Sequence, residues 1–213
     1  PQWEYPIAPE GSNSDKLDFS NLLVPTLDST RGQFVVSKFH DNKRPVLLVG
    51  SSGTAKTSII NMFFQTFDAD ERITKIITFS SVTKCSNCQV AIEGSLDKRG
   101  GKTFGPPNGM KMTVFLDDLS MPEINEWGDQ PTLEIVRQLM EFNGFAFLDK
   151  DKRGSIKLIE DVKYCAAMST PGGGKNHISQ RLKRHFGIIT MVLPSITAID
   201  DIYGQMLRGR FTK

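Results

Sequence analysis

The chain has 213 residues, of which 38% are hydrophobic and 23% charged, and this size suits one large α/β domain with a real core. Its 26 basic and 24 acidic side chains give a net charge of +2, which excludes a general attraction to nucleic acid or to an anionic membrane. No apolar run approaches the roughly 20 residues that span a bilayer. The amino terminus lacks a basic segment followed by an apolar stretch, so we expect no signal peptide, and Pro1 in place of an initiator Met leads us to expect part of a longer chain.

The chain has three cysteines, Cys85, Cys88 and Cys165. This low and odd number does not suit a disulfide scaffold and indicates a reducing compartment. Cys85 and Cys88 form a single C-x-x-C motif, whereas a structural zinc site needs four ligands. We therefore favour two ordinary helix cysteines over a metal or redox role.

The predicted elements begin with an irregular arm over residues 1–20, which is rich in Pro, Ser, Asp and Gly. A short helix is expected over 34–39 and is ended by Arg44-Pro45. Apolar and β-branched runs predict strands over 46–49, 73–79, 113–116, 164–168 and 187–192. Helical spacing of apolar residues predicts helices over 58–64, 82–96, 131–142 and 199–207. Segments 145–147 and 156–158 flank a polar stretch and predict a small inserted β-hairpin.

Strands that alternate with helices predict an α/β fold, a three-layer sandwich in which helices cover both faces of a central, mainly parallel five-stranded sheet. Ligands of such sheets bind beyond the carboxyl ends of the strands. Two motifs of this sequence follow predicted strands and therefore lie at that edge.

The first motif follows the strand at 46–49 and matches the phosphate-binding template G-x-x-x-x-G-K-[ST]. Backbone N–H groups at the start of the next helix can point at phosphate oxygens. The Lys56 ammonium can reach the outer phosphates, and the Thr57 hydroxyl can ligate Mg²⁺. The loop comprises Gly50, Ser51, Ser52, Gly53, Thr54, Ala55, Lys56 and Thr57. Ala55 stands where a second Gly is usual, and its Cβ would add crowding if that position requires a positive φ.

The second motif is the apolar strand at 113–116 followed by Asp117 and Asp118. This pattern is typical of a Walker B strand, in which the first acid holds Mg²⁺ directly or through water. The second acid is usually Glu and positions the attacking water, so Asp118 is one methylene too short. Errors near 1 Å in catalytic placement can cost about 100-fold in rate, and we therefore expect slow hydrolysis or none.

Two further segments resemble dynein heavy chains. One is Gly105-Pro106-Pro107-Asn108-Gly109-Met110-Lys111 running into residues 114–122, and the other is Pro171-Gly172-Gly173-Gly174-Lys175-Asn176 with residues 181–186. Over roughly residues 22–211 the chain resembles the third AAA+ module of the dynein motor ring. The segment Asp117-Asp118-Leu119-Ser120-Met121-Pro122 is more similar to axonemal than to cytoplasmic dyneins, whose matching segment usually has Asp-Glu.

The resemblance implies a P-loop NTPase of the AAA+ class, whose large nucleotide-binding subdomain occupies residues 21–213, with the small helical lid absent. Val24, Pro25 and Thr26 match the segment that contacts adenine. Thr170 falls near the sensor 1 position, where Asn is common, and Asn176 is a nearby polar alternative. Arg184, with Arg181 as second choice, resembles the finger that reaches a neighbouring module's nucleotide, although either arginine could equally lie on a solvated helix face.

The complete set of predicted site residues follows from these matches. Nucleotide contacts are expected from Val24, Pro25, Thr26, Gly50, Ser51, Ser52, Gly53, Thr54, Ala55, Lys56, Thr57, Ser58 and Asp117. Thr57 and Asp117 are the expected metal ligands, and Asp118, Thr170 and Arg184 the expected catalytic residues.

The function implied is a regulatory module of a dynein microtubule motor that binds ATP or ADP with Mg²⁺. Its implied partners are neighbouring AAA+ modules of the same heavy chain and, through other parts of the full protein, dynein light and intermediate chains and microtubules. We expect no nucleic acid or membrane partner, and a location in the cytoplasm on the cytoskeleton of a cilium or flagellum axoneme. A nucleotide-independent structural ring segment and a free-standing P-loop NTPase or kinase remain the alternatives.

Overall fold

The computed structural model describes residues 23–147 and 154–211. Its helices are α1 (Leu27–Asp41), α2 (Lys56–Phe64), α3 (Cys85–Glu93), a 3₁₀ turn (Pro107–Gly109), α4 (Pro131–Phe142), α5 (Gln180–Lys183) and α6 (Ile196–Phe211). Its strands are β1 (Val46–Val49), β2 (Arg72–Thr78), β3 (Asp97–Gly100), β4 (Thr103–Gly105), β5 (Lys111–Asp117), β6 (Gly144–Ala146), β7 (Ile156–Ile159), β8 (Val162–Met168) and β9 (Gly187–Thr190).

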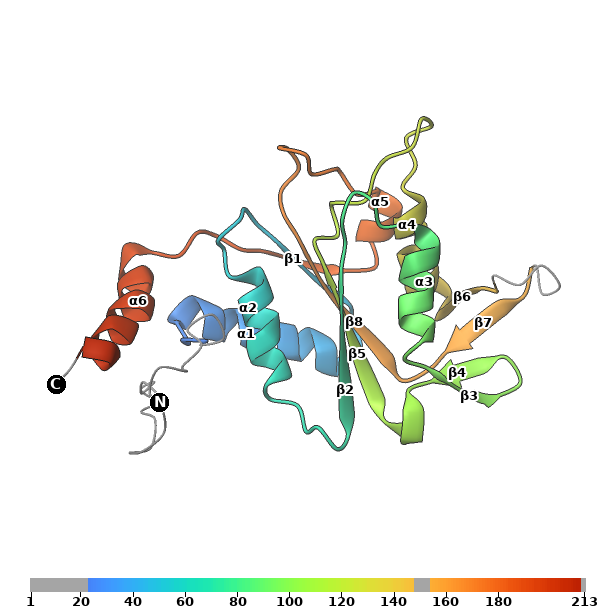
Figure 1. Ribbon diagram of the computed structural model, residues 1–213, viewed down its shortest axis with the longest axis horizontal. Helices are drawn as coiled ribbons and strands as arrows, with labels where there is room; N and C mark the ends of the chain where they lie inside the picture. Colours follow the sequence, from blue (N-terminus) through green and yellow to red (C-terminus); the bar gives the residue numbers. More distant parts are fainter. Residues whose placement is uncertain (1–22, 148–153, 212–213) are drawn as a thin grey trace.

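The central sheet has five strands in the order β2-β5-β8-β1-β9. All four pairings are parallel, as the sequence predicted. Helices α1 and α2 cover one face and α3 and α4 the other, which gives the expected three layers (Figure 1). The arm over residues 1–20 lies outside the described residues.

Side-chain alternation along the strands explains why both faces are covered. On β8, Tyr164 and Ala166 join the hydrophobic cluster under α3 and α4, whereas Cys165 and Ala167 join the cluster under α1 and α2. A parallel strand buried on both faces therefore appears in the sequence as an unbroken apolar run rather than an alternating one.

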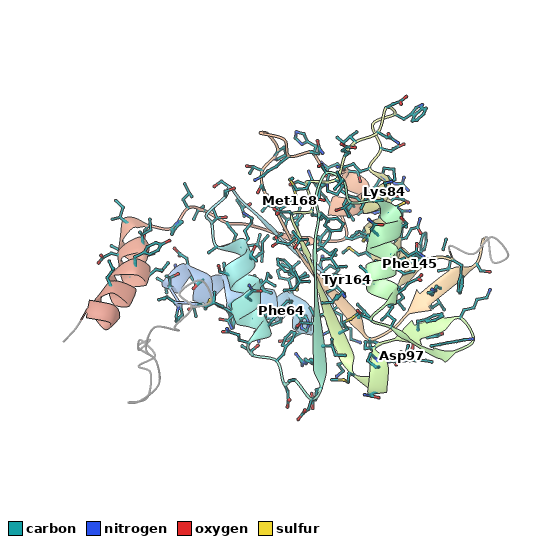
Figure 2. All side chains as sticks on the ribbon, in the orientation of Figure 1. Phe64, Lys84, Asp97, Phe145, Tyr164 and Met168 are labelled. Atoms are coloured by element: carbon teal, nitrogen blue, oxygen red, sulfur yellow. The ribbon has the colours of Figure 1, made fainter. Side chains whose placement is uncertain are left out.

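A second sheet of four strands, in the order β3-β4-β7-β6, lies beyond α3 and α4 at the right of Figure 1. The predicted hairpin is confirmed as β6 and β7, which pair antiparallel with Phe145 opposite Lys157. Phe145 is fully buried near α3 (Figure 2), and Gln89 of α3 donates a hydrogen bond to the Ala146 carbonyl at 3.0 Å. Residues 148–153 of the hairpin tip lie outside the described residues.

Strands β3 and β4 were not predicted, and the helix expected over 82–96 was too long. The helix is α3, and the chain then forms an antiparallel pair in which Lys98 lies opposite Phe104. Every residue of β3 is exposed, so its sequence Asp-Lys-Arg-Gly carries neither the apolar alternation of a half-buried strand nor a buried run.

Helix α1 is longer than predicted because it begins well before Phe34. Thr26 caps its amino end: the Thr26 hydroxyl accepts from the Ser29 N–H at 3.2 Å, while the Ser29 hydroxyl accepts from the Thr26 N–H at 2.8 Å. Helix α6 likewise extends past the predicted 199–207 at both ends. Among the described helices, none combines the length and apolarity that a membrane crossing requires.

Candidate phosphate-binding site

The predicted phosphate loop joins β1 to α2 at the carboxyl edge of the central sheet (Figure 1). Its base is fixed to both neighbouring strands. The Gly50 N–H donates to the Met168 carbonyl of β8 at 3.2 Å, and the Met191 N–H donates to the Val49 carbonyl at 2.7 Å. Figure 2 places Met168 toward this edge of the sheet. A Cβ at Gly50 would lie 2.6 Å from the Met191 carbonyl oxygen, so only glycine fits there.

Ala55 adopts the left-handed conformation, with φ 58° and ψ 22°, immediately before α2. The sequence predicted crowding from the Ala55 Cβ if this position had a positive φ, and the position does have one. A residue with a Cβ costs about 1–2 kcal/mol in this region relative to right-handed backbone. The loop holds Ala55 in a strained conformation that glycine would adopt freely.

Lys56 folds its side chain back over the loop. Its ammonium donates to the carbonyl oxygens of Gly50 at 3.0 Å and Ser51 at 2.8 Å. Burial lowers the Lys56 pKa, and the positive charge of Lys175 lowers it further, while Asp117 and Asp118 act in the opposite direction. The ammonium therefore lies against the carbonyl oxygens of the loop itself.

Thr57 and Asp117 approach each other across two elements. The Thr57 hydroxyl at the start of α2 donates to Oδ2 of Asp117 at the end of β5 over 3.0 Å, and the Asp118 N–H donates to the other carboxylate oxygen, Oδ1, at 3.0 Å. Burial raises the Asp117 pKa, and the two hydrogen bonds partly reverse this shift. A hydroxyl beside a carboxylate at a phosphate loop is an oxygen donor set that suits Mg²⁺.

Asp118 begins a tight turn rather than extending the strand. Its φ is 55°, and its carbonyl accepts from the Met121 N–H at 2.9 Å. Aspartate tolerates the left-handed region better than most residues. The half-buried Asp118 carboxylate is close enough to Lys56 that its negative charge raises the Lys56 pKa, against the lowering by burial.

Lys175 is a basic residue at this site to which the sequence assigned no role. Its ammonium donates to the Ser169 hydroxyl at 2.7 Å and to the Ser52 hydroxyl of the phosphate loop at 3.4 Å. It follows Gly172, Gly173 and Gly174, all of which have positive φ. The sequence did contain a signal for Lys175 as a site residue: it follows a glycine-rich turn, and that turn follows a strand that ends at this edge of the sheet.

Thr170 and Asn176, the two choices for sensor 1, have different surroundings. Thr170 is exposed just beyond β8, and its buried neighbour Ser169 binds Lys175. The Asn176 amide donates to the Pro122 carbonyl at 2.8 Å, and the Asn176 N–H donates to the Ser120 carbonyl at 2.8 Å. Asn176 therefore joins the segment after β8 to the segment after β5.

The three residues matched to an adenine contact lie at the start of α1. Val24 is buried, Pro25 is exposed, and the Thr26 side chain caps the helix. Within residues 23–147 and 154–211, no hydrogen bond joins the Thr26 side chain to the phosphate loop. Ser58, in the first turn of α2, is half-buried.

The two candidate finger arginines lie at α5, away from the phosphate loop. Arg184 is ion-paired with Glu141 of α4 at 2.9 Å, and its side chain is 57% exposed. Arg181 lines a cavity of about 600 Å³ between α4, α5 and the loop before α4, together with Ile124 and His177. In the described part of the chain, neither arginine forms a hydrogen bond or ion pair with residues 50–57.

The C-x-x-C cysteines both lie in α3, as the preferred interpretation required. Burial raises the Cys88 pKa to about 12, which favours the thiol over the reactive thiolate. Among the residues described, no three His, Cys, Asp or Glu side chains are grouped as a metal site.

Comparison with known proteins agrees with this geometry. The family model for the P-loop containing dynein motor region matches residues 12–194. The dynein gamma chain of the flagellar outer arm from Chlamydomonas reinhardtii is 49% identical over 213 residues, 100% of this chain and 5% of that protein. Dynein axonemal heavy chain 5 from Rattus norvegicus is 48% identical over 194 residues, 91% of this chain and 6% of that protein. Dynein axonemal heavy chain 8 from Mus musculus is 45% identical over 210 residues, 98% of this chain and 4% of that protein. The chain thus spans between 4% and 6% of the length of these relatives.

Proposed function

The chain belongs to the family of P-loop containing dynein motor regions, and on that premise we propose that it binds ATP or ADP with Mg²⁺ as a regulatory module of an axonemal dynein, the third of its ring. The bound nucleotide would bias the conformation of the ring instead of supplying the main power stroke. The observation that carries the proposal is the Lys56 ammonium over the phosphate loop beside the Thr57–Asp117 pair.

The residues fit a magnesium–phosphate ligand. Thr57 and Asp117 would hold Mg²⁺, which when bound neutralises phosphate charge. Lys56 would exchange its carbonyl partners for phosphate oxygens, because an ammonium bonds more strongly to an anion than to a neutral carbonyl. Lys175 would supply a second positive charge beside Ser52 of the loop.

Slow or absent hydrolysis is the second part of the proposal. Asp118 has a shorter side chain than the usual Glu, and its backbone turns away from the strand at φ 55°. Thr170 is exposed, and its hydroxyl forms no hydrogen bond within the described residues. A water-positioning group tolerates little displacement, so these features favour a module that retains nucleotide over one that turns it over.

In the full protein, neighbouring AAA+ modules of the same heavy chain would contact this module, with Arg184 or Arg181 reaching the adjacent nucleotide. Light and intermediate chains and microtubules would bind elsewhere on the heavy chain. The relatives named for axonemes and the flagellar outer arm support a place on the cytoskeleton of a cilium or flagellum.

Calorimetric titration of Mg-ATP and Mg-ADP into the chain, Lys56→Ala and Lys98→Ala tests nucleotide binding. Loss of charge-assisted hydrogen bonds worth about 1.5–3 kcal/mol should weaken binding by roughly 10- to 150-fold in Lys56→Ala. Lys98, which is exposed on β3, is the matched control and should leave affinity unchanged. Equal affinities in all three proteins would contradict binding through Lys56. No binding in any of them would contradict the proposal and favour a nucleotide-independent structural segment.

Phosphate release tests the hydrolysis part separately. The chain and Asp118→Asn should both release phosphate at the background rate while retaining bound nucleotide. Steady turnover that Asp118→Asn abolishes would contradict the regulatory role without affecting the binding proposal.

A further inference from the structure

Basic side chains gather at the end of the central sheet opposite the phosphate loop. They line a cavity of about 410 Å³ at the amino ends of β5 and β8, here called the basal pocket. This is the lower edge of the sheet in Figure 1, and Tyr164, labelled in Figure 2, lies on its wall. The positively charged residues that line it are Lys43, Arg44, Arg72, Lys111 and Lys163.

The five cations come from four segments that the fold brings together. Lys43 and Arg44 follow α1, and the other three lie at the starts of β2, β5 and β8. Arg72 and Lys111 are direct register partners on neighbouring parallel strands. Like charges at such positions repel one another, so the apposition lowers the stability of the sheet.

The basal pocket holds little negative charge to balance these cations. Among the described residues, the one carboxylate on its wall is Asp161, which already forms an ion pair with Arg99 outside the pocket. Over the described residues, none of the five cations has a carboxylate within ion-pair distance. Arg72 packs over the Phe67 ring, and the Lys163 ammonium donates to the His40 carbonyl at 2.8 Å.

Two groups on the pocket wall, the half-buried Lys163 and the buried His40, lie in this positive potential. Burial and then the charge of Arg72 lower the Lys163 pKa, and Lys111 and Lys43 lower it further, against an opposing effect of Asp41. His40 is 4% exposed, and its Nδ1 forms no hydrogen bond within the described part of the chain.

We propose that the basal pocket binds a multiply charged anion of the phosphate class, at a site distinct from the nucleotide site. Its volume lies in the range of about 300–1,000 Å³ that is usual for small-ligand pockets. Two arginines can each present paired donors to one anion, and the three lysines add point charges. Met112, Met140 and Tyr164 supply an apolar wall that would accommodate the organic part of a phosphate ester.

Titration of pyrophosphate into the 213-residue chain carrying Lys56→Ala tests the proposal, since this background removes the main phosphate ligand of the other site. Adding Arg72→Gln and Lys111→Gln should weaken pyrophosphate binding by about tenfold or more, because two charge-assisted contacts are lost. Adding Lys38→Gln and Lys98→Gln, which remove the same charge from outside the pocket, should weaken it less than about twofold at moderate salt.

Equal weakening by the two pairs of substitutions, or no pyrophosphate binding in the Lys56→Ala parent, would overturn the proposal. If the Arg72/Lys111 variant fails to fold, Lys43→Gln with Arg44→Gln on the exposed turn tests the same pocket. A parallel titration with phenyl phosphate separates the sources: tighter binding than pyrophosphate indicates a phosphate ester, and weaker binding an inorganic polyphosphate. Binding of an acidic peptide but of neither phosphate would also overturn the proposal.

Discussion

At the carboxyl end of the central sheet, Lys56 donates to two carbonyl oxygens and lies near two carboxylates. At the amino end Arg72 and Lys111 lie side by side, and among the described residues neither is ion-paired with a carboxylate. The same strands connect the two ends, since β5 begins at Lys111 and ends at Asp117. One strand therefore contributes an acid to one site and a base to the other.

The two ends differ in the partners of their cations. In the phosphate loop the Lys56 ammonium donates to carbonyl oxygens of the loop, so a ligand would have to replace these hydrogen bonds. Within the described residues, the cations of the basal pocket have no carboxylate at ion-pair distance, so an anion there would relieve their mutual repulsion. The following predictions separate effects on the shared sheet from effects on either end.

The largest effect is expected from Phe115→Ala, which disrupts the strand that both ends share. Phe115 is fully buried and meets the Phe64 ring edge-on at a centroid distance of 6.3 Å. Removing its ring should cost about 3–5 kcal/mol of unfolding free energy through lost burial and a residual cavity. Urea unfolding measures this loss. Phe34→Ala, at a phenylalanine that is 62% exposed on α1, is the control and should change stability by about 0.5 kcal/mol or less. Similar losses in both variants would place the core elsewhere.

A second large effect belongs to the amino end and depends on pH. Burial first, and then the charges of Lys163 and Arg72, lower the pKa of His40 from 6.5 to about 4, against a small opposing effect of Asp41. The folded state binds this proton more weakly than the unfolded chain does. The contribution of neutral His40 to the free energy of unfolding is therefore fully present above pH 6.5 and is lost as pH falls toward 4. This shift corresponds to about 3 kcal/mol.

Urea unfolding at several pH values between 7 and 4 measures the His40 contribution. Carboxylates also titrate in this range, so the informative quantity is the difference between the chain and His40→Gln, whose stability should fall less steeply. His177→Gln, at an exposed histidine, should retain the slope of the unmodified chain. An unchanged slope in His40→Gln would show that the pocket does not hold this imidazole neutral.

The carboxyl end is tested by Lys175→Met. The Lys175 ammonium reaches the Ser52 hydroxyl of the phosphate loop, so its loss should weaken Mg-ATP binding by about tenfold, the equivalent of one charge-assisted hydrogen bond. Calorimetry measures the change against Lys98→Met, an exposed lysine on β3. An unchanged Mg-ATP affinity in Lys175→Met would show that Lys175 does not contribute to nucleotide binding and only donates a hydrogen bond to Ser169.

The sequence placed the phosphate loop and the acidic pair at the carboxyl edge of the sheet because the information for that placement is local. The phosphate loop is one continuous motif, and the strand before each acidic or basic group is an apolar run that locates the edge of the sheet. The role of Lys175 was not predicted because its approach to Ser52 depends on the backbone conformation of three glycines with positive φ. Residue type alone does not specify that conformation.

The amino end was not predicted because its residues are distant in sequence. Lys43 and Lys163 lie 120 positions apart, and only the pairing of β5 with β8 and of β2 with β5 brings their neighbours together. Strand β3 was missed for another reason: an exposed strand such as Asp97–Gly100 gains its order from backbone pairing, which leaves no apolar pattern in the sequence. Strand β4 has only three residues, which is too short for a periodic pattern.

The smallest effect, and the one with an unusual sign, is expected from Ala55→Gly in the phosphate loop. Glycine adopts the observed φ of 58° without steric cost, whereas it is more flexible in the unfolded chain. The net gain should be about 0.5–1 kcal/mol. For a chain of this size a gain of about 1 kcal/mol raises the melting temperature by roughly 2–4 °C. Ala91→Gly, the same change inside α3, should instead destabilise by about 1 kcal/mol. A melting temperature that falls in both variants would mean that the Ala55 methyl group makes contacts worth more than its backbone strain.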